Sequence, residues 1–294
     1  MPIPIPDAAQ RRPLRREDFR DWTTYYWTYQ YQLVEGYLIP WLRTWGAWTD
    51  DVRVLDVGCG DGGASVALAE NGAHVEGFDL EPRRVTMGAE RAKARGLDLR
   101  LGVADVTDPS TLGDYDGPYD LILFRDVLEH IPDVDAALLQ SRERLAPGGS
   151  IVVIYPPYWC AFGGHQQILH PPKKLGVPWA RLPFIHWSGL GIWRALARGP
   201  EGDDAEWPEI VTIRRAALTI GGLRKRAKAH GLEVAQARHY LLRPTFRLRY
   251  GTPVVDAGVV GAVPGLREVL VTGSWQALRR VGDAAATPKG PPNG

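Results

Sequence analysis

Glycines and a carboxylate at residues 54–63 have the types and the spacing of a loop that binds a nucleotide. An apolar run leads into Asp56, and glycines then follow in the pattern G-x-G-x-x-G from Gly58 to Gly63. Glycine lets the backbone turn sharply and approach a ligand where a Cβ atom would clash. The helix-forming run that follows directs its free N–H groups toward the same point. We therefore expect a nucleotide or a nucleoside to lie against this loop.

Three acidic residues narrow the class of ligand, because each lies at or near the end of a predicted strand. Asp79 follows the glycines by about 20 residues, where a carboxylate can accept both hydroxyls of a ribose. Asp105 follows the third predicted strand, where it can accept a hydrogen bond from an adenine amino group. Asp56 would repel a pyrophosphate but would attract a cation. The pattern favours a positively charged adenosine derivative over a dinucleotide.

Four histidines are candidates for a general base, a role that suits histidine near neutral pH: His130, His165, His170 and His186. We favour His165, because it lies in a glycine-containing loop after the fifth predicted strand, whose carboxyl end faces the ligand site. The alternative is that His165 caps a backbone group. His130 is the second candidate, and surface or capping roles are expected for His170 and His186.

Strands and helices alternate between residues 52 and 154, which predicts a mainly parallel sheet with helices on both faces. Strands are expected at 52–57, 74–79, 98–103, 119–125 and 150–155, and helices at 62–71, 82–95 and 134–145. The alternation stops after residue 155. It resumes with a helix at 219–231, a strand near 232–242 and a final strand at 267–274.

Two aromatic segments stand outside this alternation. Rings recur at helical spacing in residues 20–48, which is typical of a helix that faces the core. There are more aromatic rings than one buried face of a helix can hold. We therefore expect part of the segment to cover a ligand pocket, with Tyr25, Tyr26 and Gln30 as contacts. Residues 156–210 are rich in proline and tryptophan, which predicts an inserted cap. The expected division is an N-terminal arm and helical lid at 1–50, a main domain at 51–283 with the cap insertion at about 156–216, and a flexible tail at 284–294.

Composition indicates a globular protein of 294 residues, 45% of them hydrophobic, with a net charge of +1. A charge so close to zero argues against a nucleic-acid partner. Two cysteines cannot form a disulfide framework, which suits a reducing compartment. The N-terminus lacks a signal-peptide pattern, and no apolar run is long enough to span a bilayer. We expect a cytoplasmic monomer or homodimer without stable membrane insertion.

Five segments follow one another in the order and spacing of a known family. They are VLDVGCGDG, GFDL, the AD after the third strand, YDLI with DVLEHIPD, and LAPGGSIVV. With these segments the sequence resembles the class I S-adenosylmethionine-dependent methyltransferases, strongly over residues 52–155 and more loosely over 219–280. The resemblance implies an α/β, Rossmann-like sheet of seven strands in the order 3-2-1-4-5-7-6, with only the last strand antiparallel.

The resemblance also implies which residues bind the cofactor, S-adenosylmethionine. Asp56 would lie near its amino group, Asp79 would hold the ribose hydroxyls, and Leu80 would pack on the adenine. Further residues are implied in the glycine loop, beside the edge of the adenine, at the end of the fourth strand and in the helical lid. The full set is Asp56, Gly58, Cys59, Gly60, Gly62, Asp79, Leu80, Ala104, Asp105, Arg125 and Tyr26.

The segment DVLEH bears on metal binding. It is similar to the EVLEH segment of ubiquinone-biosynthesis O-methyltransferases, where two acids and a histidine bind a divalent metal. Here Asp126 replaces the first glutamate before Glu129 and His130, and many metal-free relatives carry a like segment. We therefore predict no metal and keep Mg²⁺ as the less favoured alternative. Without a metal, Glu129 and His130 would cap a helix and line the pocket.

The predicted function is methyl transfer to a small, apolar or aromatic acceptor, most simply O-methylation of a secondary metabolite or a quinone-like compound. Carbon and nitrogen acceptors remain open, and the aromatic lid and cap suggest an enclosed cavity. A second hypothesis is cyclisation or cleavage of the same cofactor, which would release methylthioadenosine. A third is a nicotinamide oxidoreductase, and a fourth is a binding protein without catalytic activity.

Overall fold

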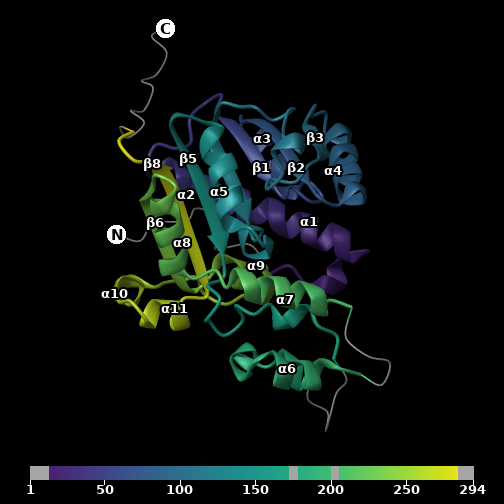
Figure 1. Cartoon of the computed structure of the whole chain (residues 1–294). Helices are drawn as coiled ribbons and strands as arrows, with labels where there is room; N and C mark the ends of the chain where they lie inside the picture. The colour runs from purple at the N-terminus through teal and green to yellow at the C-terminus, as the bar shows by residue number, and fades with distance from the viewer. Residues whose placement is uncertain (1–12, 172–177, 200–204, 284–294) are drawn as a thin grey trace.

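The computed structural model describes residues 13–171, 178–199 and 205–283. Within these ranges one sheet of eight strands has the order β3-β2-β1-β4-β5-β8-β6-β7 (Figure 1). The strands are β1 Arg53–Val57, β2 His74–Asp79, β3 Arg100–Val103, β4 Tyr119–Arg125, β5 Leu145–Tyr155, β6 Leu232–Leu242, β7 Val255–Asp256 and β8 Gly273–Arg280. Strands β1 to β5 are parallel to one another, β8 is antiparallel to both β5 and β6, and β7 is antiparallel to β6. The predicted fold class and strand order are confirmed, with β7 added at one edge.

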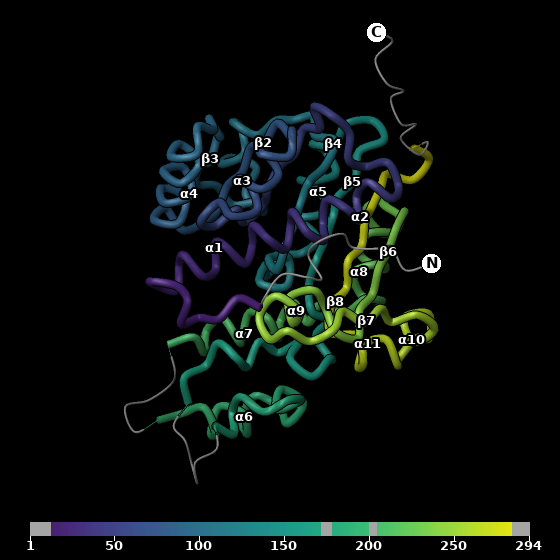
Figure 2. The backbone as a smooth tube through the Cα atoms, turned by 180° about the vertical axis from the view of Figure 1, so that it is seen from behind, coloured from purple at the N-terminus to yellow at the C-terminus, as the bar shows by residue number. Residues whose placement is uncertain are grey.

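Helices cover both faces of the sheet, because successive side chains of a strand point to opposite sides. Val54 packs in a core cluster with residues of the first helices, whereas its neighbour Leu55 packs in a second cluster with the later helices. Figure 1 shows α5 and α8 over one face, and Figure 2 shows α1 and α2 over the other. The bounds are α1 Trp22–Leu33, α2 Ile39–Arg43, α3 Gly63–Glu70, α4 Pro82–Ala94, α5 Val134–Glu143 and α8 Ile220–Ala229.

The aromatic N-terminal segment is mainly core. Asp21 starts α1 by accepting a hydrogen bond from the N–H of Thr24, and Tyr25 and Tyr29 are buried on its inner face. A π-helical turn at Val34–Leu38 joins α1 to α2. Tyr26 is 40% exposed, so the aromatic residues of α1 lie on both a buried and an exposed face of the helix. Residues 1–12 of the predicted N-terminal arm lie outside the described residues, as does the tail at 284–294.

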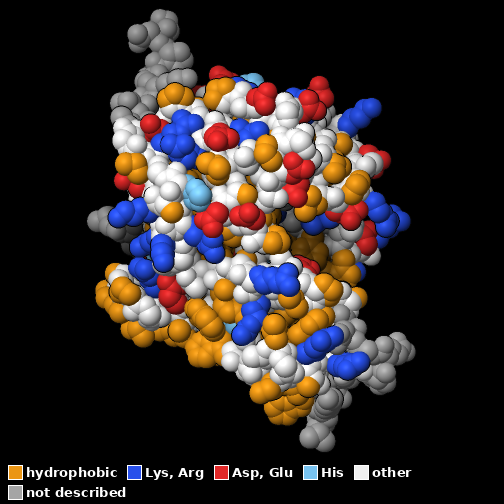
Figure 3. Space-filling model, in the orientation of Figure 1, with side chains coloured by type: hydrophobic (Ala, Val, Ile, Leu, Met, Phe, Trp, Pro, Cys, Tyr) orange, Lys and Arg blue, Asp and Glu red, His pale blue; other side chains and the backbone are white. Residues whose placement is uncertain are grey.

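The segment after β5 forms short helices at the carboxyl end of the sheet, where Figure 1 shows α6 and α7. Its described helices are the 3₁₀ turns Gln166–Ile168, Trp179–Arg181 and Ile185–Ser188 with α6 Leu190–Ala197 and α7 Trp207–Ala216. Trp193 and Trp207 are buried in a small core cluster of this segment alone. None of the described helices is long and apolar enough to cross a membrane. Figure 3 shows acidic and basic side chains interspersed over one face of the molecule.

The last part of the chain differs from the prediction. We expected a strand at 267–274, but α11 occupies Leu266–Leu270 and β8 begins only at Gly273. The helical turn positions Glu268, whose carboxylate accepts hydrogen bonds from the N–H groups of Ile220 and Gly221 at the start of α8. A tertiary contact thus overrides the strand propensity of the sequence. Two further helices in this part of the chain were not predicted, α9 Pro244–Tyr250 and α10 Gly258–Ala262.

Candidate active site

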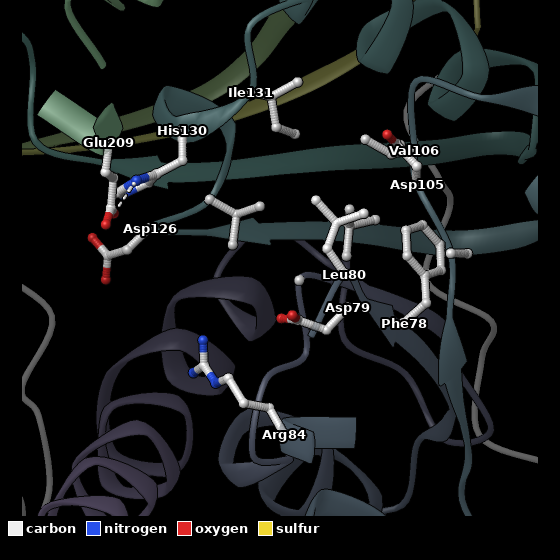
Figure 4. A pocket seen from close by; sticks show the side chains of 14 residues that line it. Phe78, Asp79, Leu80, Arg84, Asp105, Val106, Asp126, His130, Ile131 and Glu209 are labelled. Atoms are coloured by element: carbon white, nitrogen blue, oxygen red, sulfur yellow. Dashed lines mark ion pairs between the residues drawn. The ribbon is translucent and has the colours of Figure 1, made fainter. Parts of the chain in front are cut away.

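A cavity of about 360 Å³ lies at the carboxyl ends of β1, β2 and β4 (Figure 4). In the sheet, β2 lies on one side of β1 and β4 on the other, so the strand order reverses at β1. Open α/β sheets bind ligands at such a point. The lining residues come from the ends of β1 to β4 and the turns that follow them, from α4 and from the inserted segment: Val57, Gly58, Phe78, Asp79, Leu80, Arg84, Ala104, Asp105, Val106, Asp126, Val127, His130, Ile131 and Glu209. Six of the predicted site residues are in this set, namely Gly58, Asp79, Leu80, Ala104, Asp105 and His130.

The glycine loop has the tight geometry predicted for it. Gly58, Gly60 and Gly62 have φ angles of +72°, +53° and +78°, which side chains rarely allow. A Cβ atom on Gly58 would lie 2.5 Å from the side chain of Val127 across the cavity wall. On Gly63, it would lie 2.6 Å from the carbonyl oxygen of Trp27 in α1. The loop therefore requires glycine for its own turn and for the close approach of α1.

Asp79 and Asp105 are positioned by backbone hydrogen bonds. The two carboxylate oxygens of Asp79 accept the N–H groups of Gly60 and Glu81 at 3.0 and 2.9 Å. Oδ1 of Asp105 accepts both the N–H and the hydroxyl of Thr107. A carboxylate oxygen has further acceptor capacity, so both groups remain able to bind a ribose or an adenine. Leu80 is 68% exposed at the cavity wall, which suits packing on a flat ring.

Asp56 is buried beneath the loop, with only 1% of its surface exposed. Its Oδ2 accepts a hydrogen bond of 2.6 Å from the hydroxyl of Ser65. Burial raises the pKa of Asp56 to about 6, although Ser65 and the charge of Arg125 oppose the shift. A cationic ligand at the loop would favour the ionised form. The cation preference inferred from the sequence therefore stays a prediction.

Several predicted residues do not line the cavity in this structure. Cys59, Gly60 and Gly62 form the loop behind it, and Cys59 is fully buried. Tyr26 contacts Trp22 and Tyr25 instead. The remaining predicted residues outside the lining are Asp56, Arg125 and His165.

Two charged lining residues were missed from the sequence. Nε of Arg84 donates to Asp61 at 2.8 Å, and its guanidinium lies where a side chain on Gly60 would be. Glu209, in α7, faces His130 (Figure 4), and its Oε1 lies 2.8 Å from Nδ1 of His130. Burial lowers the pKa of His130, but the hydrogen bond to Glu209 and nearby carboxylates raise it on balance. His130 is therefore stabilised in its charged form.

His165 lies behind His130, with ring centroids 4.7 Å apart. Its backbone has a left-handed φ of +54°, its Nε2 lies 3.7 Å from Oε1 of Glu129, and both side chains are less than 10% exposed. Burial lowers the pKa of His165 well below its usual 6.5 and raises the pKa of Glu129. Neither oxygen of Glu129 has a hydrogen-bond partner in the described part of the chain.

Among the remaining histidines, His170 is exposed, as expected, but His186 is not. His186 is fully buried between the loop at Gly164 and Tyr158, so of the surface and capping roles predicted for it, the surface role is wrong. The short turn that begins at Ile185 folds back onto the inserted segment and encloses the ring. Burial lowers the pKa of His186 to about 4.

The residues predicted as the alternative metal site do not come together as a set. Asp126 is paired with Arg243 at 3.3 Å, whereas donor atoms of Glu129, His130 and His165 lie within 4.8 Å of one another. This group has the donor types that hold zinc or a similar ion. The charge of Arg243 acts on both Glu129 and His165 and opposes a cation there, and the absence of a metal stays a prediction.

Comparison with known proteins identifies the class. Residues 15–237 match the family described as a methyltransferase domain, so the chain belongs to this family. The predicted class, S-adenosylmethionine-dependent methyltransferase, and its cofactor are confirmed at the level of the family. The glycine loop, Asp79 and the exposed Leu80 fit that cofactor.

Individual relatives match over a shorter stretch. A ubiquinone biosynthesis O-methyltransferase of Xylella fastidiosa (strain 9a5c) is 37% identical over 101 residues, which are 34% of this chain and 40% of that protein. Norajmaline N-methyltransferase of Rauvolfia serpentina is 35% identical over 103 residues, or 35% of each protein. The chain thus matches less than half of either relative. A putative sarcosine dimethylglycine methyltransferase from Galdieria sulphuraria has a TM-score of 0.52 at 16% identity over 84% of each chain, a likeness of fold.

Proposed function

We propose that the protein transfers the methyl group of S-adenosylmethionine to a hydroxyl group of a small apolar or aromatic acceptor, with His165 as the general base. The observation that carries the proposal is the buried contact of 3.7 Å between Nε2 of His165 and Oε1 of Glu129. A carboxylate beside one ring nitrogen orients the imidazole and stabilises its charged form.

His165 has the protonation state that a base needs. Because its pKa is lowered by burial, its ring is neutral at neutral pH, and its Nδ1 has no partner among the described residues. In the proposed scheme Nδ1 takes the proton of the acceptor hydroxyl, while the proton on Nε2 faces Glu129. His130 lines the cavity between this pair and the strand ends, and we assign it to positioning the acceptor.

The cofactor residues are assigned as the family resemblance implies. When bound, S-adenosylmethionine supplies a methyl group that is already activated by a sulfonium. Asp79 would hold the ribose, Leu80 and Asp105 the adenine, and Asp56 the cationic amino-acid end. The remaining assignments are Ala104 at the adenine edge, Gly58, Cys59, Gly60, Gly62 and Arg125 at the methionine end, and Tyr26 on the covering helix.

The domain division belongs to the same proposal. The helical segment within 1–50 would cover the glycine loop, since Trp27 of α1 closely approaches Gly63. The insertion within 156–216 would enclose the acceptor, since it carries both His165 and Glu209. Residues 51–283 would form the catalytic domain.

Calorimetric titration with S-adenosylhomocysteine and with NAD⁺ tests the proposal. We expect S-adenosylhomocysteine to bind and NAD⁺ not to bind. Binding of NAD⁺ without binding of S-adenosylhomocysteine would overturn it.

A further inference from the structure

Two long connections leave the sheet at its carboxyl end. Because β5 and β6 run in the same direction and β8 runs against both, residues 156–219 begin at this end, and residues 243–272 join β6 to β8 there. Figures 1 and 2 show α6 of the first connection and α10 and α11 of the second at this end of the molecule. In Figure 3, hydrophobic side chains gather over the same helices.

The first connection exposes a cluster of aromatic rings. The ring centroid of Trp187 lies 6.1 Å from that of Trp159 and 5.0 Å from that of Phe184, and the three residues are 48%, 40% and 37% exposed. They form the aromatic patch. The core of this segment does not need them, because Trp193 and Trp207 fill it and are buried. Clustered exposed rings mark a surface that meets an apolar partner.

The second connection has its charges turned inward and its aliphatic side chains outward. Residues 257–272 contain two charged side chains, Arg267 and Glu268, which are only 13% and 17% exposed. By contrast, four aliphatic residues of α10, α11 and the turn between them are 37% to 82% exposed, namely Val259, Val263, Leu266 and Leu270. They form the aliphatic patch. A surface that faces only water has the opposite arrangement, so this patch is suited to an apolar neighbour.

The two connections also carry an excess of positive charge. Together, residues 156–219 and 243–272 contain eleven Lys and Arg and seven Asp and Glu, a net charge of +4, whereas the whole chain has +1. The rest of the chain is therefore net negative. Arg214 lies beside the aromatic patch, because its Nη1 donates to the carbonyl of His186 and to the hydroxyl of Tyr158. Neither acceptor is a carboxylate, so the charge of Arg214 can act on an external anion.

Apolar side chains among cations fit the surface of an anionic bilayer. Aromatic rings are favoured where headgroups meet acyl chains, and an apolar surface is stabilised when it sinks to that depth. Lys and Arg near the surface add attraction to anionic lipid. A second copy of the chain fits less well, because a symmetric contact would bring two ends of net positive charge together.

We propose that the aromatic patch and the aliphatic patch bind the surface of a bilayer that contains anionic phospholipid. The protein lies on this surface with the carboxyl end of its sheet toward the headgroups. The inference goes beyond methyl transfer and does not depend on the acceptor, because the residues of both patches lie outside the lining of the cavity.

Co-sedimentation of the full chain with vesicles tests the inference. The wild type should bind vesicles of phosphatidylcholine mixed with phosphatidylglycerol at least about tenfold more tightly than vesicles of phosphatidylcholine alone. Binding to the mixed vesicles should weaken as the salt concentration rises. Trp187→Ser and Val259→Asp should each weaken it by at least about fivefold, because one loses an apolar ring and the other adds a negative charge.

Val281→Asp is the matched control. Val281 is 61% exposed and follows the end of β8, which lies at the opposite end of the sheet because β8 is antiparallel to β5. This variant should bind the mixed vesicles as the wild type does. Val259 is 82% exposed, so its replacement disturbs little packing. Titration with S-adenosylhomocysteine should give the same affinity for all variants as for the wild type.

Failure of the wild type to bind the mixed vesicles overturns the inference without recourse to any variant. Unchanged binding in Trp187→Ser or Val259→Asp protein also overturns it, as does equal weakening by Val281→Asp. Sedimentation velocity without vesicles identifies the competing occupant. A wild-type dimer that Val259→Asp converts to a monomer would assign the aliphatic patch to a second copy and contradict the inference. If the wild type binds no S-adenosylhomocysteine, the proposed function fails, and vesicle binding still decides the inference.

Discussion

Nδ1 of His130, in the 3₁₀ turn Leu128–His130 after β4, lies 2.8 Å from a carboxylate oxygen of Glu209 in α7. This ion pair joins the turn after β4 to the segment inserted after β5. Both side chains remain partly exposed, at 26% and 46%, so the pair is accessible to solvent from one side. The cavity wall is thus completed by a residue far away in the sequence.

The first prediction concerns the pH dependence of this pair. The pKa of His130 is raised above 6.5 and that of Glu209 is lowered below 4.5, so both are charged between these values. The stabilisation by His130 is fully present below 6.5 and is lost as the pH rises through its folded-state pKa. Glu209→Gln should lower the melting temperature near pH 6 but have little effect near pH 9. The cost should stay below about 1 kcal/mol, because the pair is partly exposed. An equal effect at both pH values would contradict the pairing.

Asp56 should make cofactor binding depend on pH. Its pKa of about 6 means that it is largely protonated at about pH 5 and ionised at about pH 7. Affinity for S-adenosylmethionine should therefore rise by up to about tenfold across this interval, since the ligand is cationic. Asp56→Asn should bind more weakly and with a flat pH profile. Calorimetry at several pH values checks this, and an unchanged slope in the variant would assign the titration to another group.

Asp79 should contribute through the ribose hydroxyls. Asp79→Asn removes the charge and should weaken binding of S-adenosylhomocysteine by roughly 10- to 100-fold, the range for hydrogen bonds to a charged group. A deoxyribose analogue of the ligand should bind wild type and variant with a much smaller difference. If the variant weakens both ligands equally, the role of Asp79 is to hold the loop through Gly60.

The base assignment predicts effects on turnover alone. His165→Ala should lower turnover by roughly 10²- to 10⁴-fold while affinity for S-adenosylhomocysteine stays near that of the wild type. Glu129→Gln should lower turnover as well, because the imidazolium loses its neighbouring carboxylate. His74→Ala is the control, since His74 is exposed at the start of β2. Unchanged turnover in His165→Ala protein would exclude His165 as the base.

Metal removal should have no effect. The charge of Arg243 acts on both Glu129 and His165 and disfavours a cation at these residues. Dialysis against a chelator should leave turnover unchanged, and elemental analysis of the purified protein should find no stoichiometric metal. One equivalent of zinc that is lost in Glu129→Gln protein would show that these residues are ligands.

The sequence allowed prediction of those parts of the site that depend on local structure. Gly58 and Asp79 follow from a strand, a turn and a helix that are contiguous in the chain, so their geometry is determined locally. Glu209 and Arg243 could not be predicted, because their contacts depend on how the insertion and the end of β6 fold over β4. The same reason explains the error at 267–274, where Glu268 serves the start of α8. No sequence motif marks residues whose partners are defined by tertiary packing.

The most direct test of the central claim is mass spectrometry of the products formed from S-adenosylmethionine with a panel of phenols and hydroxylated benzoates. Methyl transfer predicts S-adenosylhomocysteine together with an acceptor heavier by one CH₂ unit at oxygen. Formation of methylthioadenosine, with no methylated acceptor, would contradict the claim and assign the protein to cyclisation or cleavage of its cofactor.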